Sequence, residues 1–170
     1  MNLPKMSKLL IIFLALFILS VGCQQTDTLK AEDLMNPEKL LAYRKNVSEK
    51  NRALANSMYQ YGINAAKKDS ASASKAFSES ALMYPTSAAF IKMAEHRAKM
   101  LVKKEDKVKQ AVLSEIINYL QVADKLNAVD HMLSNDERAM LAQDKACTEE
   151  YFESKKIPTS CRPLTWLGLN

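Results

Sequence analysis

The sequence predicts an all-α protein, built as an array or bundle of about five helices, and three observations favour this class. Glycine is rare, at 3 of 170 residues, while alanine, leucine, lysine and glutamate are plentiful. Apolar residues recur at spacings of three and four, which is the period of a helix with one buried face. No stretch shows the sustained alternation of β-branched and polar residues that predicts a strand. Capping residues and prolines divide the chain into its elements.

Residues 1–22 predict a signal peptide. The segment MNLPKMSK carries two lysines and no acid, and 14 uncharged residues follow, from Leu9 to Gly22. A basic start, a short apolar run and small residues before a cleavage point are typical of secretory signals. As a helix the apolar run would span about 21 Å, which is too short for a hydrocarbon core of ~30 Å. A retained membrane-spanning helix is therefore disfavoured.

The end of this segment resembles the lipobox of bacterial lipoproteins. Ser20-Val21-Gly22-Cys23 supplies the small residues and the cysteine, and Leu19 stands one place earlier than the leucine of most such boxes. The resemblance implies a lipid on Cys23, cleavage directly before it and, because Gln24 follows, delivery to the outer membrane on its periplasmic face. Several acyl chains would hold a soluble domain there durably. The alternative is a plain signal peptide that is cleaved elsewhere.

Residues 23–35 predict a flexible polar tether, and a helical domain is expected over 36–153. Asn36 is the expected N-cap of the first helix and Pro37 its first residue, and two lysines near 67–68 suit its C-terminal end. Apolar residues spaced by seven, four and three predict one buried stripe on this helix, formed by Leu40, Val47, Leu54, Met58, Tyr61 and Ala65.

A cap at Asp69 or Ser70 opens the second predicted helix, and Pro85 stops it because its ring cannot continue the helical hydrogen bonds. Its expected inner face is formed by Ala73, Phe77, Ala81 and Tyr84. The third helix is expected within 86–104, with one face formed by Phe90, Met93, Ala94, Arg97 and Leu101.

The fourth helix is expected from Glu105 to about Asn127, and its buried face is Val108, Val112, Ile116, Tyr119, Leu120 and Ala123. Ser134 and Glu137 form a capping box that opens the fifth helix. Along it Met140, Leu141, Asp144, Cys147 and Tyr151 follow at helical spacing. Residues 154–170 contain two prolines and the only tryptophan, and are expected to be an irregular tail.

Cys147 and Cys161 are the two cysteines that remain if Cys23 carries lipid. Export exposes them to an oxidising compartment, so a disulfide that ties the tail to the last helix is predicted. A closed loop of about 15 residues corresponds to roughly 3 kcal/mol of chain entropy. The alternatives are two free thiols or a metal site, and neither His96 nor His131 stands at ligand spacing from the cysteines.

The pattern Ala73-x-x-x-Phe77-x-x-Ser80-Ala81-x-x-x-Pro85 resembles the second helix of a tetratricopeptide repeat. In that family small residues let two helices approach closely, an aromatic ring fills the space between them, and proline ends the unit. A fainter echo lies 42 residues later, at Tyr119, Val122, Ala123 and Leu126. The resemblance implies helical hairpins with a concave surface that binds peptide. The alternative is an unrelated five-helix bundle.

No arrangement of residues in the sequence predicts catalysis. The serines cluster at a helix start, where serine caps, and the acidic stretches lie where helix N-termini attract negative charge. His96 is flanked by charged residues and is expected to be solvated, and His131 is expected in a turn or on the surface. No glycine-rich phosphate loop is present in the sequence. We therefore expect a protein that is not an enzyme and needs no cofactor or metal.

The leading hypothesis is an outer-membrane lipoprotein that acts as an adaptor or assembly factor, by holding a segment of an envelope protein in a secretion, pilus or outer-membrane assembly complex. Small helical pilotins resemble this chain in size, anchor and disulfide. The net charge of +5 falls to +3 when Lys5 and Lys8 leave with the predicted signal peptide, and this is too small to indicate nucleic-acid binding. Methionine lines adaptable binding surfaces, so the candidate partner-binding residues are Met58, Tyr61, Phe90, Met93 and Arg97.

Three alternatives to this hypothesis stay open. The methionines could fill the core instead of lining a groove. The chain could be a cell-wall enzyme, which predicts two acids in a cleft, one of them with a raised pKa. It could also be a purely structural protein of the envelope.

Overall fold

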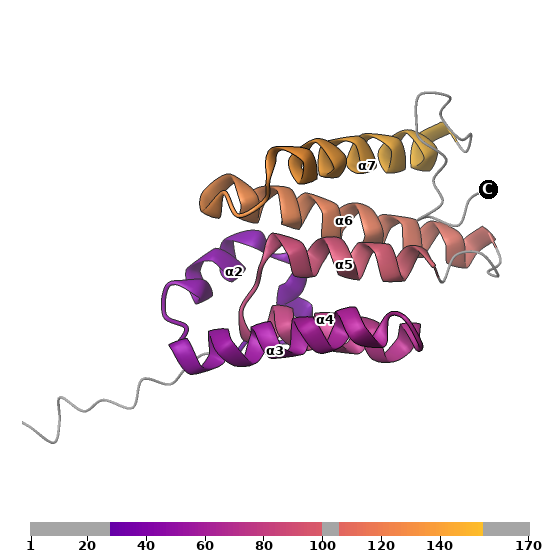
Figure 1. The fold of residues 1–170 in the computed structure, drawn as a ribbon. Helices are drawn as coiled ribbons and strands as arrows, with labels where there is room; N and C mark the ends of the chain where they lie inside the picture. The colour runs from indigo at the N-terminus through magenta and orange to yellow at the C-terminus, as the bar shows by residue number, and fades with distance from the viewer. Residues whose placement is uncertain (1–27, 100–105, 155–170) are drawn as a thin grey trace, which may run out of the picture.

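The computed structural model describes residues 28–99 and 106–154, and within these residues the chain is helical with no strand (Figure 1). The all-α class is confirmed. The elements are a 3₁₀ helix, η1 (Ala31–Met35), and six α-helices, namely α2 (Pro37–Arg44), α3 (Glu49–Ala65), α4 (Ser70–Met83), α5 (Ser87–Ala98), α6 (Asp106–Asp130) and α7 (Asn135–Ser154). None of the helices in these ranges combines the length and the apolar composition that a bilayer span requires.

Helices α3 to α7 pack in the order of the chain, each against the next (Figure 1). Figure 1 shows α3 and α4 at one side, α5 and α6 in the middle, and α7 at the other side. The N-terminal elements η1 and α2 lie across this series, because η1 contacts α4 and α6 and α2 contacts α6. The described part of the chain is therefore a sequential array whose middle is covered by its own N-terminal segment.

The first predicted helix is wrong in one respect, since the chain forms two helices there. Residues 45–48 separate α2 from α3, and Ser48 opens α3 by accepting a hydrogen bond from the Asn51 N–H at 3.2 Å. Because α2 and α3 are separate helices, residues that would share one face of a single continuous helix need not face the same side of the protein. Leu40 on α2 and Val47 within the break are buried as predicted.

After the break Leu54 and Tyr61 of the predicted stripe face solvent, whereas Ala65 packs on the core. Leu54 and Tyr61 are 44% and 57% exposed, whereas Ala55 and Gly62, one residue later in each case, are buried. The buried face of α3 is completed by three partly buried residues that pack on the core, Tyr59, Ile63 and Ala65.

The predicted tether is also wrong for its second half. Leu34 is buried in the core, and the nearby Asp33 carboxylate accepts hydrogen bonds from the Lys30 N–H at 2.7 Å and from the Lys39 ammonium at 2.6 Å. Leu29 packs on the core as well. Residues 29–35 therefore belong to the folded body. The predicted signal peptide, Cys23 and most of the predicted tail lie outside the described residues.

Helices α3 and α4 approach each other closely at Gly62. A Cβ atom on Gly62 would stand 2.6 Å from Cε1 of Phe77, so only glycine allows this distance. The Phe77 ring is fully buried and lies 5.6 Å from the Tyr59 ring, centroid to centroid. One turn further, the Ser80 hydroxyl donates to the Ala55 carbonyl at 2.8 Å. A glycine facing an aromatic ring thus sets the separation of the two helices.

The predicted local signals for the starts of α4 and α7 are confirmed, and the cap of α5 is a further one that was not predicted. Asp69 caps α4 by accepting from the Ala71 N–H at 3.0 Å, and Thr86 caps α5 by accepting from the Ala89 N–H at 3.2 Å. The capping box of α7 is present, because Ser134 and Glu137 each accept from the backbone N–H of the other. Helix α6 extends to Asp130, three residues beyond the predicted end.

Candidate functional site

A cavity of about 360 Å³ lies where α3, the junction of α4 with α5, and the turn between α6 and α7 meet. Its volume is at the lower end of the range for small-ligand sites, roughly 300–1,000 Å³. Aromatic and aliphatic side chains form much of the wall, namely Tyr59, Tyr84, Met132, Leu133, Ala55 and Ala88. We take this cavity as the candidate binding site.

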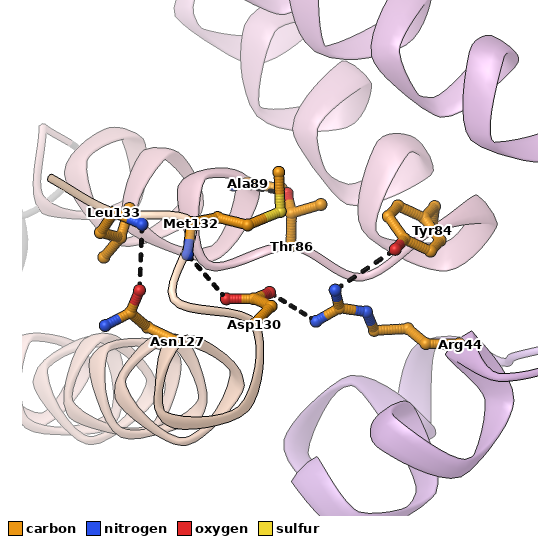
Figure 2. Close-up of polar contacts among 8 residues, drawn as sticks. All are labelled: Arg44, Tyr84, Thr86, Ala89, Asn127, Asp130, Met132 and Leu133. Atoms are coloured by element: carbon orange, nitrogen blue, oxygen red, sulfur yellow. Dashed lines mark hydrogen bonds and ion pairs between the residues drawn. The ribbon is translucent and has the colours of Figure 1, made fainter.

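A buried ion pair supports one side of the cavity (Figure 2). The Arg44 guanidinium, on α2, lies 2.6 Å from an Asp130 carboxylate oxygen at the end of α6, and the two side chains are 11% and 9% exposed. Arg44 also donates to the Tyr84 hydroxyl at 3.3 Å, and its charge lies 5.0 Å from the centre of the Tyr84 ring. Burial acts to lower the pKa of Arg44, but the hydrogen bonds to Tyr84 and Asp130 outweigh burial and raise it.

The turn between α6 and α7 is held by two side chains of α6 (Figure 2). Asp130 accepts from the Met132 N–H at 3.2 Å, and Asn127 accepts from the Leu133 N–H at 3.0 Å. Between them His131 has a φ of 51°, the left-handed conformation that ends a helix. The prediction that His131 lies in an inter-helix turn is confirmed. These contacts fix Met132 and Leu133 at the cavity.

The start of α5 forms a polar part of the wall. Thr86, Ser87 and Ala88 all line the cavity, and the first N–H groups of a helix have no partner within that helix. The Ser87 hydroxyl is buried, and no hydrogen-bond partner for it exists in the described part of the chain. Buried polar atoms are normally paired, so this hydroxyl is an exception that a bound group would resolve.

Two charged side chains, Arg52 and Glu137, line the cavity, and they differ in the hydrogen bonds and ion pairs that they make. The Arg52 guanidinium lies 5.2 Å from the centre of the Tyr84 ring, and no carboxylate among the described side chains, those of residues 28–99 and 110–154, pairs with it. Glu137 instead accepts from the Ser134 N–H at 2.8 Å and the Ser134 hydroxyl at 2.7 Å, and these bonds lower its pKa. The two formal charges of the wall cancel, and Arg52 is the one whose charge is not matched by a carboxylate among the described side chains.

The five candidate partner-binding residues do not come together in a groove. Phe90 and Met93 are 0% and 2% exposed in the core, so their assignment to a partner surface is wrong. Arg97 pairs with Glu115 of α6 at 2.7 Å. Met58 and Tyr61 lie on α3, where Tyr61 is exposed and neither residue lines the cavity. Helix α5 is packed between α4 and α6, which buries the face that holds Phe90 and Met93.

Sequence reasoning missed most of the cavity residues. Met132 is one of several methionines, a residue type that often lines adaptable binding surfaces. Nothing in the sequence around Arg52, Tyr84 or Ser87 indicates a binding site. A Pro85-Thr86-Ser87 segment predicts a helix start but not what that start faces. Only the packing of α3 against α4 and of the N-terminal α2 beside α6 brings these residues together.

His96 is buried, and the expectation that it is solvated is wrong. Its side chain is enclosed between α4 and α5, with Nδ1 3.0 Å from the Ser70 hydroxyl and the ring centre 5.3 Å from that of Phe77. Burial lowers the pKa of His96, and the positive charge of Lys99 lowers it further.

This burial predicts a pH-dependent stability. Because the pKa of His96 is lower in the folded chain, the unfolded chain binds more protons between that folded pKa and the ordinary value near 6.5. The contribution of His96 is thus fully present above about pH 6.5 and is lost as the pH falls through the folded pKa. In urea unfolding between about pH 7.5 and 5, His96→Gln should lose less stability than the unmodified chain. Parallel profiles for the two chains would show that His96 is not the titrating group.

Cys147 is buried on α7, and its sulfur is not a free thiol. Its predicted partner, Cys161, lies outside the described residues, so the bridge between the two stays a prediction. Within the described ranges no three His, Cys, Asp or Glu side chains gather in a way that could hold a metal ion.

Comparison with known proteins gives no relative, since no protein-family model, no curated protein and no solved structure matches this chain.

Proposed function

We propose that this chain is a lipoprotein of the outer membrane, facing the periplasm, that binds a segment of an envelope protein in the cavity between α3 and the α6–α7 turn. The lipobox-like Ser20-Val21-Gly22-Cys23 supports the address. The cavity supports the activity, because it combines an apolar wall, an unpaired buried hydroxyl and an arginine without a carboxylate partner in the described chain. This combination is the observation that carries the proposal.

The distance from anchor to fold fits a function close to the membrane. Leu29 already packs on the core, so a fully extended chain from Cys23 to Leu29 reaches at most about 20 Å. A body held this close to a bilayer meets membrane-bound partners at a raised effective concentration. Weak binding in the cavity then suffices to hold a partner at the outer membrane.

The pKa shifts of the acidic groups give no support to the alternative of a cell-wall enzyme. Asp33, Asp69 and Glu137 have lowered pKa values, and the largest causes are hydrogen bonds from Lys39, Ser72 and Ser134 respectively. These bonds place the three groups in helix starts and turns, as caps and ion-pair partners. A binding function therefore remains the proposal.

Photocrosslinking in intact cells tests the proposed binding. A photoreactive residue at Met132, which is 65% exposed at the cavity, should give one dominant product with an envelope protein. Met140 is the matched control, because it is also a methionine, is 59% exposed on α7 and does not line the cavity. We expect little or none of that product from position 140. Equal products from both positions, or none from 132, would refute binding at the cavity.

A second pair of variants separates the cavity from the surface around it. Asn56 and Ser57 are neighbouring exposed residues of α3, but only Asn56 lines the cavity. Asn56→Trp should fill the opening and abolish the product from position 132, while Ser57→Trp should leave it unchanged.

A further inference from the structure

We infer that the cavity binds the free C-terminal carboxylate of a peptide whose last residue is apolar. The inference rests on the proposed function, since it concerns the same cavity, and it adds the chemistry of the occupant. Three donors and the apolar wall carry it.

The buried hydroxyl of Ser87 is the first donor. Its oxygen is inaccessible to solvent and has no partner in the described chain, although the residue lines the cavity. Leaving a buried polar group unpaired is costly, so an acceptor in the cavity is favoured when rotation of the Ser87 side chain brings its hydroxyl to the cavity wall.

The N-terminus of α5 is the second donor. Thr86 uses its hydroxyl oxygen on the Ala89 N–H, which leaves the earlier N–H groups of Ser87 and Ala88 without intrahelical partners. The macrodipole of a 12-residue helix adds partial positive charge at this point. Both features favour a bound anion. The Ser87 hydroxyl is one more donor from which a bound carboxylate could accept a hydrogen bond.

Arg52 is the third donor, and the contrast with Arg44 shows why. Arg44 is matched by Asp130 within the fold, whereas Arg52 lines the cavity and has no such match in the described chain. A guanidinium presents a planar pair of N–H groups that fits a carboxylate with two parallel hydrogen bonds. The charge that complements Arg52 is therefore expected on the occupant.

The size and wall of the cavity select a chain end over an internal segment. A volume of about 360 Å³ accommodates one or two residues, not a helix. Tyr59, Tyr84, Met132 and Leu133 would surround an apolar side chain on the last residue, with the carboxylate directed at α5. Glu137 also lines the cavity, and its negative charge opposes an anionic occupant.

The test is a calorimetric titration of the purified full-length chain in detergent with three probes. These are acetyl-Ala-Ala-Ala-Leu with a free carboxylate, the same peptide amidated at its C-terminus, and 4-methylpentanoate. The first should bind about tenfold more tightly than the second, because the amide loses the charge-assisted bonds. It should also bind about tenfold more tightly than 4-methylpentanoate, which is the free small carboxylate with the same side-chain shape.

Matched variants assign the effect to the donors. Arg52→Gln and Ser87→Ala should each weaken binding of the free-acid peptide about fivefold and leave the amidated peptide unchanged. Lys50→Gln removes an equal charge from α3 at a position that does not line the cavity, and should have no effect. Glu137→Gln should strengthen binding of the free acid about twofold, since it removes a repelling charge and keeps an acceptor for Ser134.

Equal affinity for the free-acid and amidated peptides would overturn the inference, and so would absence of binding by both at about 10 mM. Tighter binding of 4-methylpentanoate than of the peptide would contradict the inference that the bound carboxylate is the C-terminus of a peptide. The proposed function fails separately, when position 132 gives no crosslink in cells.

Discussion

Replacing Asp130 by alanine is expected to lower the free energy of unfolding by about 3 kcal/mol, because the variant leaves the Arg44 guanidinium buried without its counter-charge. The same change removes the acceptor for the Met132 N–H and so loosens the turn at the cavity. Urea denaturation of the two chains measures the difference.

Asp124 supplies the control for this prediction. It lies on the same helix and pairs with Lys145 at 2.6 Å, but its side chain is 53% exposed, and an exposed pair contributes at most about 1 kcal/mol. Asp124→Ala should therefore change stability little. The double variant Arg44→Met/Asp130→Ala should be more stable than Asp130→Ala alone, because no unpaired charge remains. If Asp130→Ala costs no more than Asp124→Ala, the ion pair does not support the cavity.

Replacing Phe77 by alanine is expected to cost about 4 kcal/mol, the second large effect. The ring is fully buried between α3 and α5, in contact with Tyr59 and His96, and its loss leaves a cavity that the close helices cannot fill. Thermal or urea unfolding measures this loss.

The matched change on the opposite helix is Gly62→Ala. In an open helix this substitution would stabilise by about 1 kcal/mol, but here the new Cβ meets Phe77 at 2.6 Å, so a net loss of about 1–2 kcal/mol is expected. Adding Phe77→Leu should make Gly62→Ala less costly than it is alone, because the narrower side chain relieves the clash. A Gly62→Ala chain that is more stable than the original would contradict the close approach of α3 and α4.

Sequence predicts the helices of this fold well where the signal is local. The caps at Asn36, Asp69 and Ser134 act within four residues, so the sequence alone identifies them and the helices they open. The inner face of α4 follows from periodicity for the same reason, and Ala73, Phe77 and Ala81 are all fully buried. Local chemistry and helical period suffice for such features.

The break before α3 shows where local signals compete. Apolar residues recur every seven positions here, at Leu40, Val47, Leu54 and Tyr61. In the sequence alone this regular spacing is a stronger signal than the one capping residue, Ser48, that interrupts it. The capping bond of Ser48 divides that series, and Leu54 and Tyr61, which follow it, face solvent. The cap contributes about 1 kcal/mol at the start of α3, and the contact of Gly62 with Phe77 places the buried face of this helix on α4.

The cavity could not be predicted because its parts are far apart in the chain. Arg44 meets Tyr84 across 40 residues and Asp130 across 86. Such contacts depend on how α2 lies across the array, and periodicity along one helix contains no information on that placement. For the same reason the burial of His96, between α4 and α5, was not visible from its charged neighbours.

The anchor is the central claim of the proposed function, since it places the binding cavity beside a bilayer. Intact-mass analysis of the full-length gene product extracted from membranes tests it most directly. We predict a product that lacks residues 1–22 and begins at a Cys23 carrying acyl chains, and a Cys23→Ala variant that stays unprocessed. A product that begins at another residue, or an unmodified Cys23, would contradict the claim.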